Sequence, residues 1–176
     1  MKTTIRLSAV LFLVSACIIF ASCSAKHKAN IKKPVASPRD SITRTVNGAT
    51  ITINYGSPAV KGREIWGKLV PYDTVWRTGA NEATRFTTDK DIMVEGKTLP
   101  AGTYGFFAIP GRSSWTIIFN SVAKQWGAFK YDASKDVLRV TVTPETTKMH
   151  EHLVYKINNN GFDLSWDKIK VPVAIK

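Results

Sequence analysis

The sequence predicts an all-β protein, with one antiparallel, sandwich-like domain of about nine strands behind a signal peptide and a basic linker. Two observations predict this class. Apolar and polar residues alternate along most of the chain after residue 40, and no stretch carries a sustained helical period. Clusters of Gly, Pro and Asn separate the alternating runs at intervals of about 8 to 12 residues, the spacing of sandwiches and open barrels.

Residues 1–22 are typical of a lipoprotein-type signal peptide. Two basic residues precede an apolar run that is too short for a comfortable membrane span. Small residues stand just before Cys23 and polar residues follow it directly. We therefore expect cleavage before Cys23, lipidation of that cysteine and export to the cell envelope, with the membrane as a partner through acyl chains. Cleavage before Cys17, an uncleaved anchor and ordinary secretion remain as alternatives.

Residues 23–39 form the predicted tether, which is basic, contains two prolines and carries no acid. Such a composition favours disorder and contact with anionic lipid headgroups. All 13 acidic residues lie from Asp40 onward, so the formal charge of +12 overstates how basic the domain is. We expect no nucleic-acid partner, because the domain from Asp40 onward is only modestly basic and an exported lipoprotein rarely meets nucleic acid.

The two cysteines restrict the chemistry of the mature chain. Cleavage before Cys23 removes Cys17 and commits the remaining thiol to the lipid. A disulfide, a cysteine-ligated metal and a thiol nucleophile are then excluded.

The predicted domain, residues 40–176, begins with a hairpin over residues 42–55, in which Asn47-Gly48 supplies a two-residue turn. The strand over residues 103–109 is apolar on both faces, which predicts a central position covered on both sides. The other strands are predicted by alternation over residues 83–88, 91–94, 114–120, 137–143, 151–158, 162–166 and 171–175.

Residues 56–81 break this pattern. They form a long connection with four Gly, two Pro and two Trp. Long connections without regular structure are uncommon in compact domains and are usually functional or disordered. The aromatic content argues against disorder, so we expect this loop to pack down over the sandwich.

Several motifs in one order carry a family resemblance. They are NYGSPAVKGREIWGKLVPYDTVWRTGANEAT, LPAGTYGFFAIPG, WTIIFN, the WG pair at Trp126-Gly127 and the terminal LSWDKIKVPVAI. Over about residues 40–176 the chain resembles the domain of unknown function 2911 family. The resemblance implies an exported, mostly β domain and transfers no catalytic residue.

The candidate ligand site lies in and beside the long loop. Its donors and acceptors suit an anionic or polyhydroxylated ligand, and its Trp faces could stack on sugar rings. The candidate residues are Arg63, Trp66, Trp76, Arg77, Asn81 and Glu82. The alternative is structural: Arg77 pairs with Glu82 or with loop carbonyls, and the Trp rings fill the core.

Catalysis and metal binding have weak signals. His150 and His152 stand two residues apart on a predicted strand, but no third ligand is indicated. Within the stretch WRTGANEATRF, residues 76–86, Glu82 is the one acid, and no nucleophile elbow occurs in the sequence. We therefore name no catalytic residue, metal ligand or cofactor. The leading hypothesis is a non-catalytic binding module for a glycan or small polar ligand. An interaction protein without a small-molecule site, or a hydrolase using Glu82, is the alternative.

Overall fold

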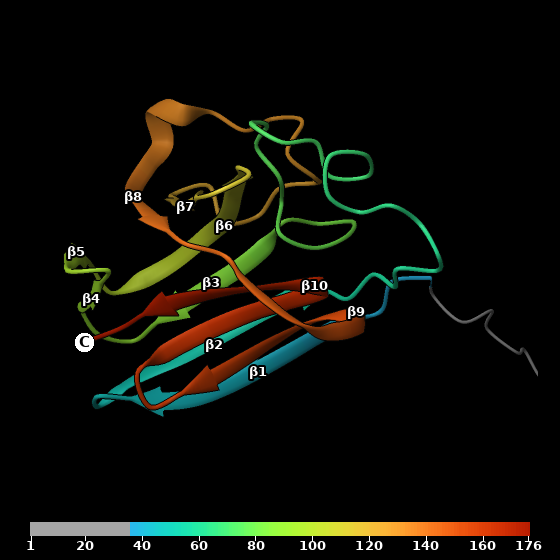
Figure 1. The fold of residues 1–176 in the computed structure, drawn as a ribbon. Helices are drawn as coiled ribbons and strands as arrows, with labels where there is room; N and C mark the ends of the chain where they lie inside the picture. Colours follow the sequence, from blue (N-terminus) through green and yellow to red (C-terminus); the bar gives the residue numbers. More distant parts are fainter. Residues whose placement is uncertain (1–35) are drawn as a thin grey trace, which may run out of the picture. The chain divides into compact units, whose positions relative to one another are not determined.

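The computed structural model describes residues 36–176, so the predicted signal peptide, Cys23 and most of the predicted tether lie outside the described residues. As predicted, this part of the chain is all-β, with antiparallel sheets and one short 3-10 turn, η1 (Ala133–Lys135). Its largest sheet has six strands in the order β1-β2-β3-β6-β7-β8 (Figure 1). The bounds are β1 (Arg39–Val46), β2 (Ala49–Gly56), β3 (Thr84–Thr88), β6 (Gly102–Pro110), β7 (Trp115–Asn120) and β8 (Asp136–Val142).

A long hairpin, β9 (Glu145–Asn158) and β10 (Gly161–Ala174), lies against strands β1 to β3 of this sheet (Figure 1). Ring contacts join the two layers: Tyr55 of β2 meets Tyr155 of β9 at 4.7 Å between centroids, and Phe86 of β3 meets Phe162 of β10 at 5.4 Å. The arrangement is sandwich-like because alternate residues of both layers are buried between them.

The hairpin turn at Asn47-Gly48 forms as predicted. Both residues have positive φ angles, 49° and 81°, as a type I′ turn requires. A second turn of this kind, at Glu95-Gly96 with φ of 48° and 78°, joins β4 (Ile92–Val94) to β5 (Lys97–Leu99). Strand β5 was not predicted, because residues 95–102 carry the Gly and Pro residues of a turn.

The end of the chain differs from the prediction. The strands predicted at residues 162–166 and 171–175 are one strand, β10, interrupted by register shifts around Asp167, whose φ is 52°. Strand β9 starts at Glu145, earlier than the predicted residue 151. With β5 added, residues 36–176 contain ten strands where about nine were predicted.

Strand β6 is central and buried on both faces, as predicted. Phe106 faces the main core, whereas Phe107 packs on the other side with Ile118 and Ala83. Tyr131 closes that second cluster, its ring lying 5.2 Å from Phe107. Segment 121–135, between β7 and β8, therefore covers the outer face of the sheet.

The 56–81 loop packs onto the domain as expected. Its apolar residues Val60, Ile65, Val70 and Trp76 are buried in the main core. The loop also receives the last residues of the predicted tether. The amide of Ser57 donates to the carbonyl of Pro38 at 2.9 Å, and β1 begins at Arg39.

Candidate functional site

A cavity of about 220 Å³ lies at the 56–81 loop. Four of the six candidate residues line it: Arg63, Trp76, Arg77 and Asn81. The other lining residues are Ser37, Pro58, Leu69, Val70, Gly79, Ala80 and Trp166. Trp66 and Glu82 do not line it, so the structure brings together only part of the predicted set.

Segment 76–84 forms a wall of this pocket and is held tightly by the sheet. The amide of Trp76 donates to the Ala108 carbonyl at 2.8 Å, and the Trp76 carbonyl accepts from the Ala108 amide at 2.9 Å. Thr78 is fully buried, donates its hydroxyl to the Phe106 carbonyl at 2.9 Å and accepts from the Tyr155 hydroxyl at 2.9 Å. These bonds fix the direction in which Arg77 leaves the backbone.

The backbone around Arg77 is also strained. Thr78 has a φ of 52°, a genuine outlier for a β-branched side chain, and Asn81 has a φ of 65°. A sparsely populated backbone conformation of this kind costs of order 1–3 kcal/mol and often accompanies a functional site. At Gly79, a Cβ would come within 3.0 Å of both Gly56 O and Thr84 Oγ1, so this close approach favours glycine.

Arg77 carries the unusual electrostatics of the site. Its Nε atom is buried and has no hydrogen-bond partner within residues 36–176. Burial lowers the pKa of its guanidinium from the ordinary value, although arginine stays charged. No aspartate or glutamate of the described chain lines the pocket. A positive charge is therefore held against a cavity that supplies no anion.

The two other polar side chains at the pocket are already partly engaged. Arg63 donates Nε to the Val60 carbonyl at 3.0 Å and Nη2 to the Ala59 carbonyl. Asn81 donates Nδ2 to the Ser37 carbonyl at 3.4 Å, which leaves its side-chain oxygen as an acceptor. Arg63 therefore adds a second positive charge, and Asn81 adds an acceptor for a ligand hydroxyl.

The tryptophans do not offer the open faces that sugar stacking needs. Trp66 contacts Trp76, Trp115 and Trp166 with ring centroids 5.7, 5.0 and 5.9 Å apart. Trp76 stacks on Trp166 at 6.0 Å and is only 8 % exposed. These rings fill the core, as the structural alternative expected, and only Trp76 and Trp166 of the four also line the pocket.

Glu82 lies on the other side of the same segment. Its carboxylate is 3.9 Å from Nη1 of Arg39 at the start of β1. The Arg77–Glu82 pair that the structural alternative expected is not formed, and no ion pair of Arg77 is present among the described residues.

A family model described as a protein of unknown function, DUF2911, matches residues 37–175. The chain belongs to this DUF2911 family. No curated protein and no solved structure matches it at a significant level. The match covers the whole folded part of this family member, from the residues that contact the loop to the end of the last strand.

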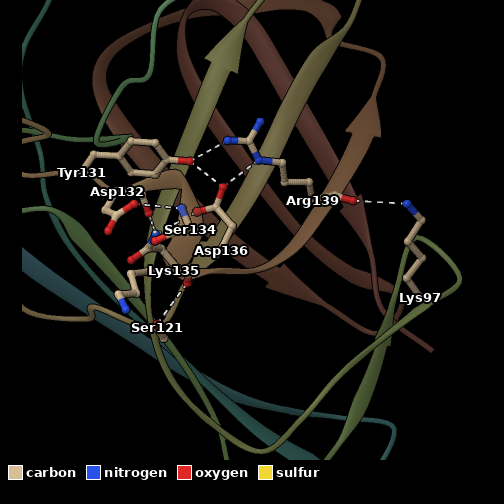
Figure 2. Close-up of polar contacts among 9 residues, drawn as sticks. Lys97, Ser121, Tyr131, Asp132, Ser134, Lys135, Asp136 and Arg139 are labelled. Atoms are coloured by element: carbon tan, nitrogen blue, oxygen red, sulfur yellow. Dashed lines mark hydrogen bonds and ion pairs between the residues drawn. The ribbon is translucent and has the colours of Figure 1, made fainter.

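A second polar cluster of this DUF2911 domain has the opposite character (Figure 2). The Asp136 carboxylate accepts from the Tyr131 hydroxyl at 2.5 Å and from Nε of Arg139 at 2.6 Å. Nη2 of Arg139 donates to the Tyr131 hydroxyl at 2.7 Å, and the buried Asn120 donates to Asp136 at 2.8 Å. Burial, followed by the bond to Asp136, raises the pKa of Tyr131 to about 12. Each charged group here has its partner within the protein.

A larger, open groove of about 860 Å³ lies near the β9–β10 turn. Its charged side chains are occupied. Arg44 donates to Asn159 at 2.9 Å, Glu145 pairs with Lys170 at 2.6 Å, and Glu95 accepts from the Ala174 amide at 2.6 Å. We therefore favour the smaller pocket, whose charge has no partner, as the candidate site.

The described part of the chain has neither a cluster of metal-binding side chains nor a membrane-spanning helix. It contains no group of three His, Cys, Asp or Glu side chains placed to hold a metal ion. Within residues 36–176, no helix is long and apolar enough to cross a membrane. His152 is exposed on β9, and its backbone bridges to Ala59 of the long loop.

Seven of the eleven residues that line the pocket were not among the candidates from the sequence. Pro58, Leu69 and Val70 are apolar loop residues without a functional signal, and Trp166 comes from a distant strand. Ser37 stands in the predicted tether. The sequence indicated the polar residues of the pocket by their type, whereas only the tertiary fold shows which apolar residues face them.

Proposed function

We propose that the protein is an envelope-anchored lipoprotein whose β domain is a non-catalytic module for a small anionic ligand. The ligand is an acidic sugar or a polar metabolite of similar size, bound in the pocket under the 56–81 loop. The observation that carries this proposal is Arg77, whose partly buried guanidinium has no acid beside it in the described chain. A buried charge without a partner is costly, and an anionic ligand would supply that partner.

The dimensions and lining of the pocket support a small ligand. Its volume of about 220 Å³ lies below the ~300–1,000 Å³ of drug-sized sites, which suits a single ring. Arg77 and Arg63 would bind the anionic group, and Asn81 would accept from a hydroxyl. The apolar wall of Leu69, Val70 and Trp76 would cover a ring or short carbon chain.

The alternatives have less support. An interaction protein without a small-molecule site leaves the Arg77 charge without an explanation. A hydrolase using Glu82 would need that carboxylate at the pocket, but Glu82 lies beside Arg39 instead. No specific observation favours either.

Thermal unfolding of the full chain with matched acidic and neutral sugars tests the ligand proposal. Glucuronate, galacturonate and a sugar phosphate are compared with glucose and galactose. We expect an acidic member to raise the unfolding temperature and its neutral counterpart to have no effect. The rise should vanish in Arg77→Gln and persist in Arg112→Gln, an exposed arginine over the Tyr72 ring. Equal shifts with neutral sugars, or none with any acidic compound, would contradict the proposal.

The anchor is tested separately, because it rests on the sequence alone. Cells that express the full chain are fed a clickable fatty acid. We expect label on the wild-type chain and none on Cys23→Ser. Label that persists in Cys23→Ser and disappears in Cys17→Ser would place the acylated cysteine at Cys17. An unlabelled wild-type chain would contradict the proposed lipid anchor.

A further inference from the structure

Segment 121–135 presents two large aromatic side chains to solvent. Trp126 is 62 % exposed and Phe129 is 83 % exposed, the highest values among the large hydrophobic residues of the described chain. Val122 of the same segment is also exposed. The other four tryptophans, in contrast, are packed together in the core.

The backbone of this segment is held to the domain, so the exposure of its aromatics is built into the fold. The amide of Gly127 donates to the Asn81 carbonyl at 3.0 Å, and the Gln125 carbonyl accepts from the Ala83 amide at 3.0 Å. Gly127 has a φ of 65°, and a Cβ there would come within 2.9 Å of the Phe129 ring. Glycine is therefore required for this turn between the two aromatics.

The C-terminal end of the segment is anchored by the cluster of Figure 2. The ring of Tyr131 packs on Phe107, and its hydroxyl bonds to Asp136 and Arg139. Tyr131 thus points into the protein, while Phe129, two residues earlier, points to water.

The charges around the two aromatics identify a partner. Lys124 and Lys130 are exposed and flank Trp126 and Phe129 in the sequence. The one acid within residues 121–135 is Asp132, whose carboxylate accepts from the Ser134 amide at 2.9 Å. Outside the segment, the backbone of Glu82 bridges to Trp126, and its carboxylate lies 3.9 Å from Nη1 of Arg39. Aromatic side chains beside lysines suit a membrane interface, where rings enter the headgroup region and lysines bind anionic lipids.

We propose that segment 121–135 docks onto an anionic lipid surface, with Trp126 and Phe129 inserted at headgroup level and Lys124 and Lys130 on the lipid phosphates. This surface is distinct from the ligand pocket, and the proposal does not depend on a ligand. It sets the orientation of the domain on a bilayer, which an N-terminal anchor alone would leave undefined.

Fluorescence of Trp126 tests the proposal in the full chain. Vesicles contain phosphatidylcholine brominated on its acyl chains, alone or in equal parts with anionic phosphatidylglycerol. Vesicle binding itself is not the measurement, because the apolar N-terminal run can also bind lipid. The Trp126 signal is the difference between the wild type and Trp126→Phe, in which only the four packed tryptophans remain.

We expect the bromine atoms to quench the Trp126 signal in anionic vesicles and acrylamide to lose access to it. Lys124→Gln with Lys130→Gln, or Phe129→Ser alone, should restore most of the emission. The control variant, Lys90→Gln with Lys148→Gln, changes two exposed lysines outside the segment and should leave the quenching unchanged. Full acrylamide access without bromine quenching would overturn the proposal and leave a protein partner for the surface. Equal quenching in zwitterionic vesicles would overturn the assignment to anionic lipid.

Discussion

Arg77 and Arg139 lie in two regions of one small domain, and their environments are opposite. Arg139 is 43 % exposed in its side chain, yet it donates to both Asp136 and Tyr131. Arg77 is more deeply placed and has neither an ion pair nor a bond at Nε within residues 36–176. A structural arginine is paired with an acid in this domain, as Arg139 is with Asp136, whereas Arg77 at the pocket has no such acid.

The difference teaches how the two regions are expected to respond to substitution. A cluster whose partners are all internal contributes to stability, and removing one member leaves the others unpaired. A partly buried charge that has no internal partner adds no stabilising pair and carries a desolvation cost that is not offset, so removing it should not destabilise the fold. The same residue type therefore reports stability at one site and binding at the other.

The largest effect is expected from Asp136→Ala. It removes the shared acceptor of Tyr131, Arg139 and the buried Asn120. We expect the free energy of unfolding in urea to fall by about 2–3 kcal/mol, below the full value for a buried pair because Arg139 can rehydrate. Asp132→Ala, in the same segment, is the control and should cost clearly less. Equal losses for the two variants would mean that the cluster is not a stabilising unit.

A smaller effect, about 1 kcal/mol, is expected from Tyr131→Phe, which loses only the hydroxyl bonds. The wild type and this variant should also differ in how their stability depends on pH. The pKa of Tyr131 is raised to about 12, whereas an unfolded tyrosine titrates near 10. The folded state therefore keeps a proton that the unfolded state has lost. This contribution is complete below about pH 10 and is lost as pH rises toward about 12.

The free energy of unfolding, measured from about pH 9 to about pH 12, checks this sign, because the interval covers the pKa of an unfolded tyrosine, near 10. The wild type should lose more stability over the interval than Tyr131→Phe does. Parallel curves would show that Tyr131 is not the group that titrates.

Glu82→Gln should have the next smaller effect. The Arg39–Glu82 separation is 3.9 Å and both side chains are partly exposed, so the pair is worth at most about 0.5 kcal/mol. Ligand-induced stabilisation by an acidic sugar should be unchanged, because Glu82 does not line the pocket. A thermal scan with and without the sugar measures both, and loss of the sugar response would return Glu82 to the site.

Much of the fold follows from local signals in the sequence. Alternation and the Asn47-Gly48 pair predicted the first hairpin, and apolar character on both faces predicted the central position of β6. The union of residues 162–166 and 171–175 into β10 was missed, because Asp167 and Lys168 interrupt the alternation where the register shifts. A bulge depends on the facing strand, which the sequence of one strand does not show.

The site was predictable in its polar residues and not in its geometry. Arg63, Arg77 and Asn81 stood out by type, and all three line the pocket. Glu82 is adjacent to Asn81 in sequence, but its side chain lies toward Arg39. The backbone turns at Asn81, whose φ is 65°, so a sequence motif alone does not tell which members share a cavity.

Substitution of Arg77 is expected to cost the fold little stability, and its measurement tests the central claim most directly. Arg77→Met and Arg139→Met are unfolded in urea beside the wild type, without ligand. We predict that Arg77→Met stays within about 1 kcal/mol of the wild type, while Arg139→Met, which strips donors from Asp136, loses more. If Arg77→Met instead loses at least as much as Arg139→Met, then Arg77 is a structural clasp and the pocket is not the binding site.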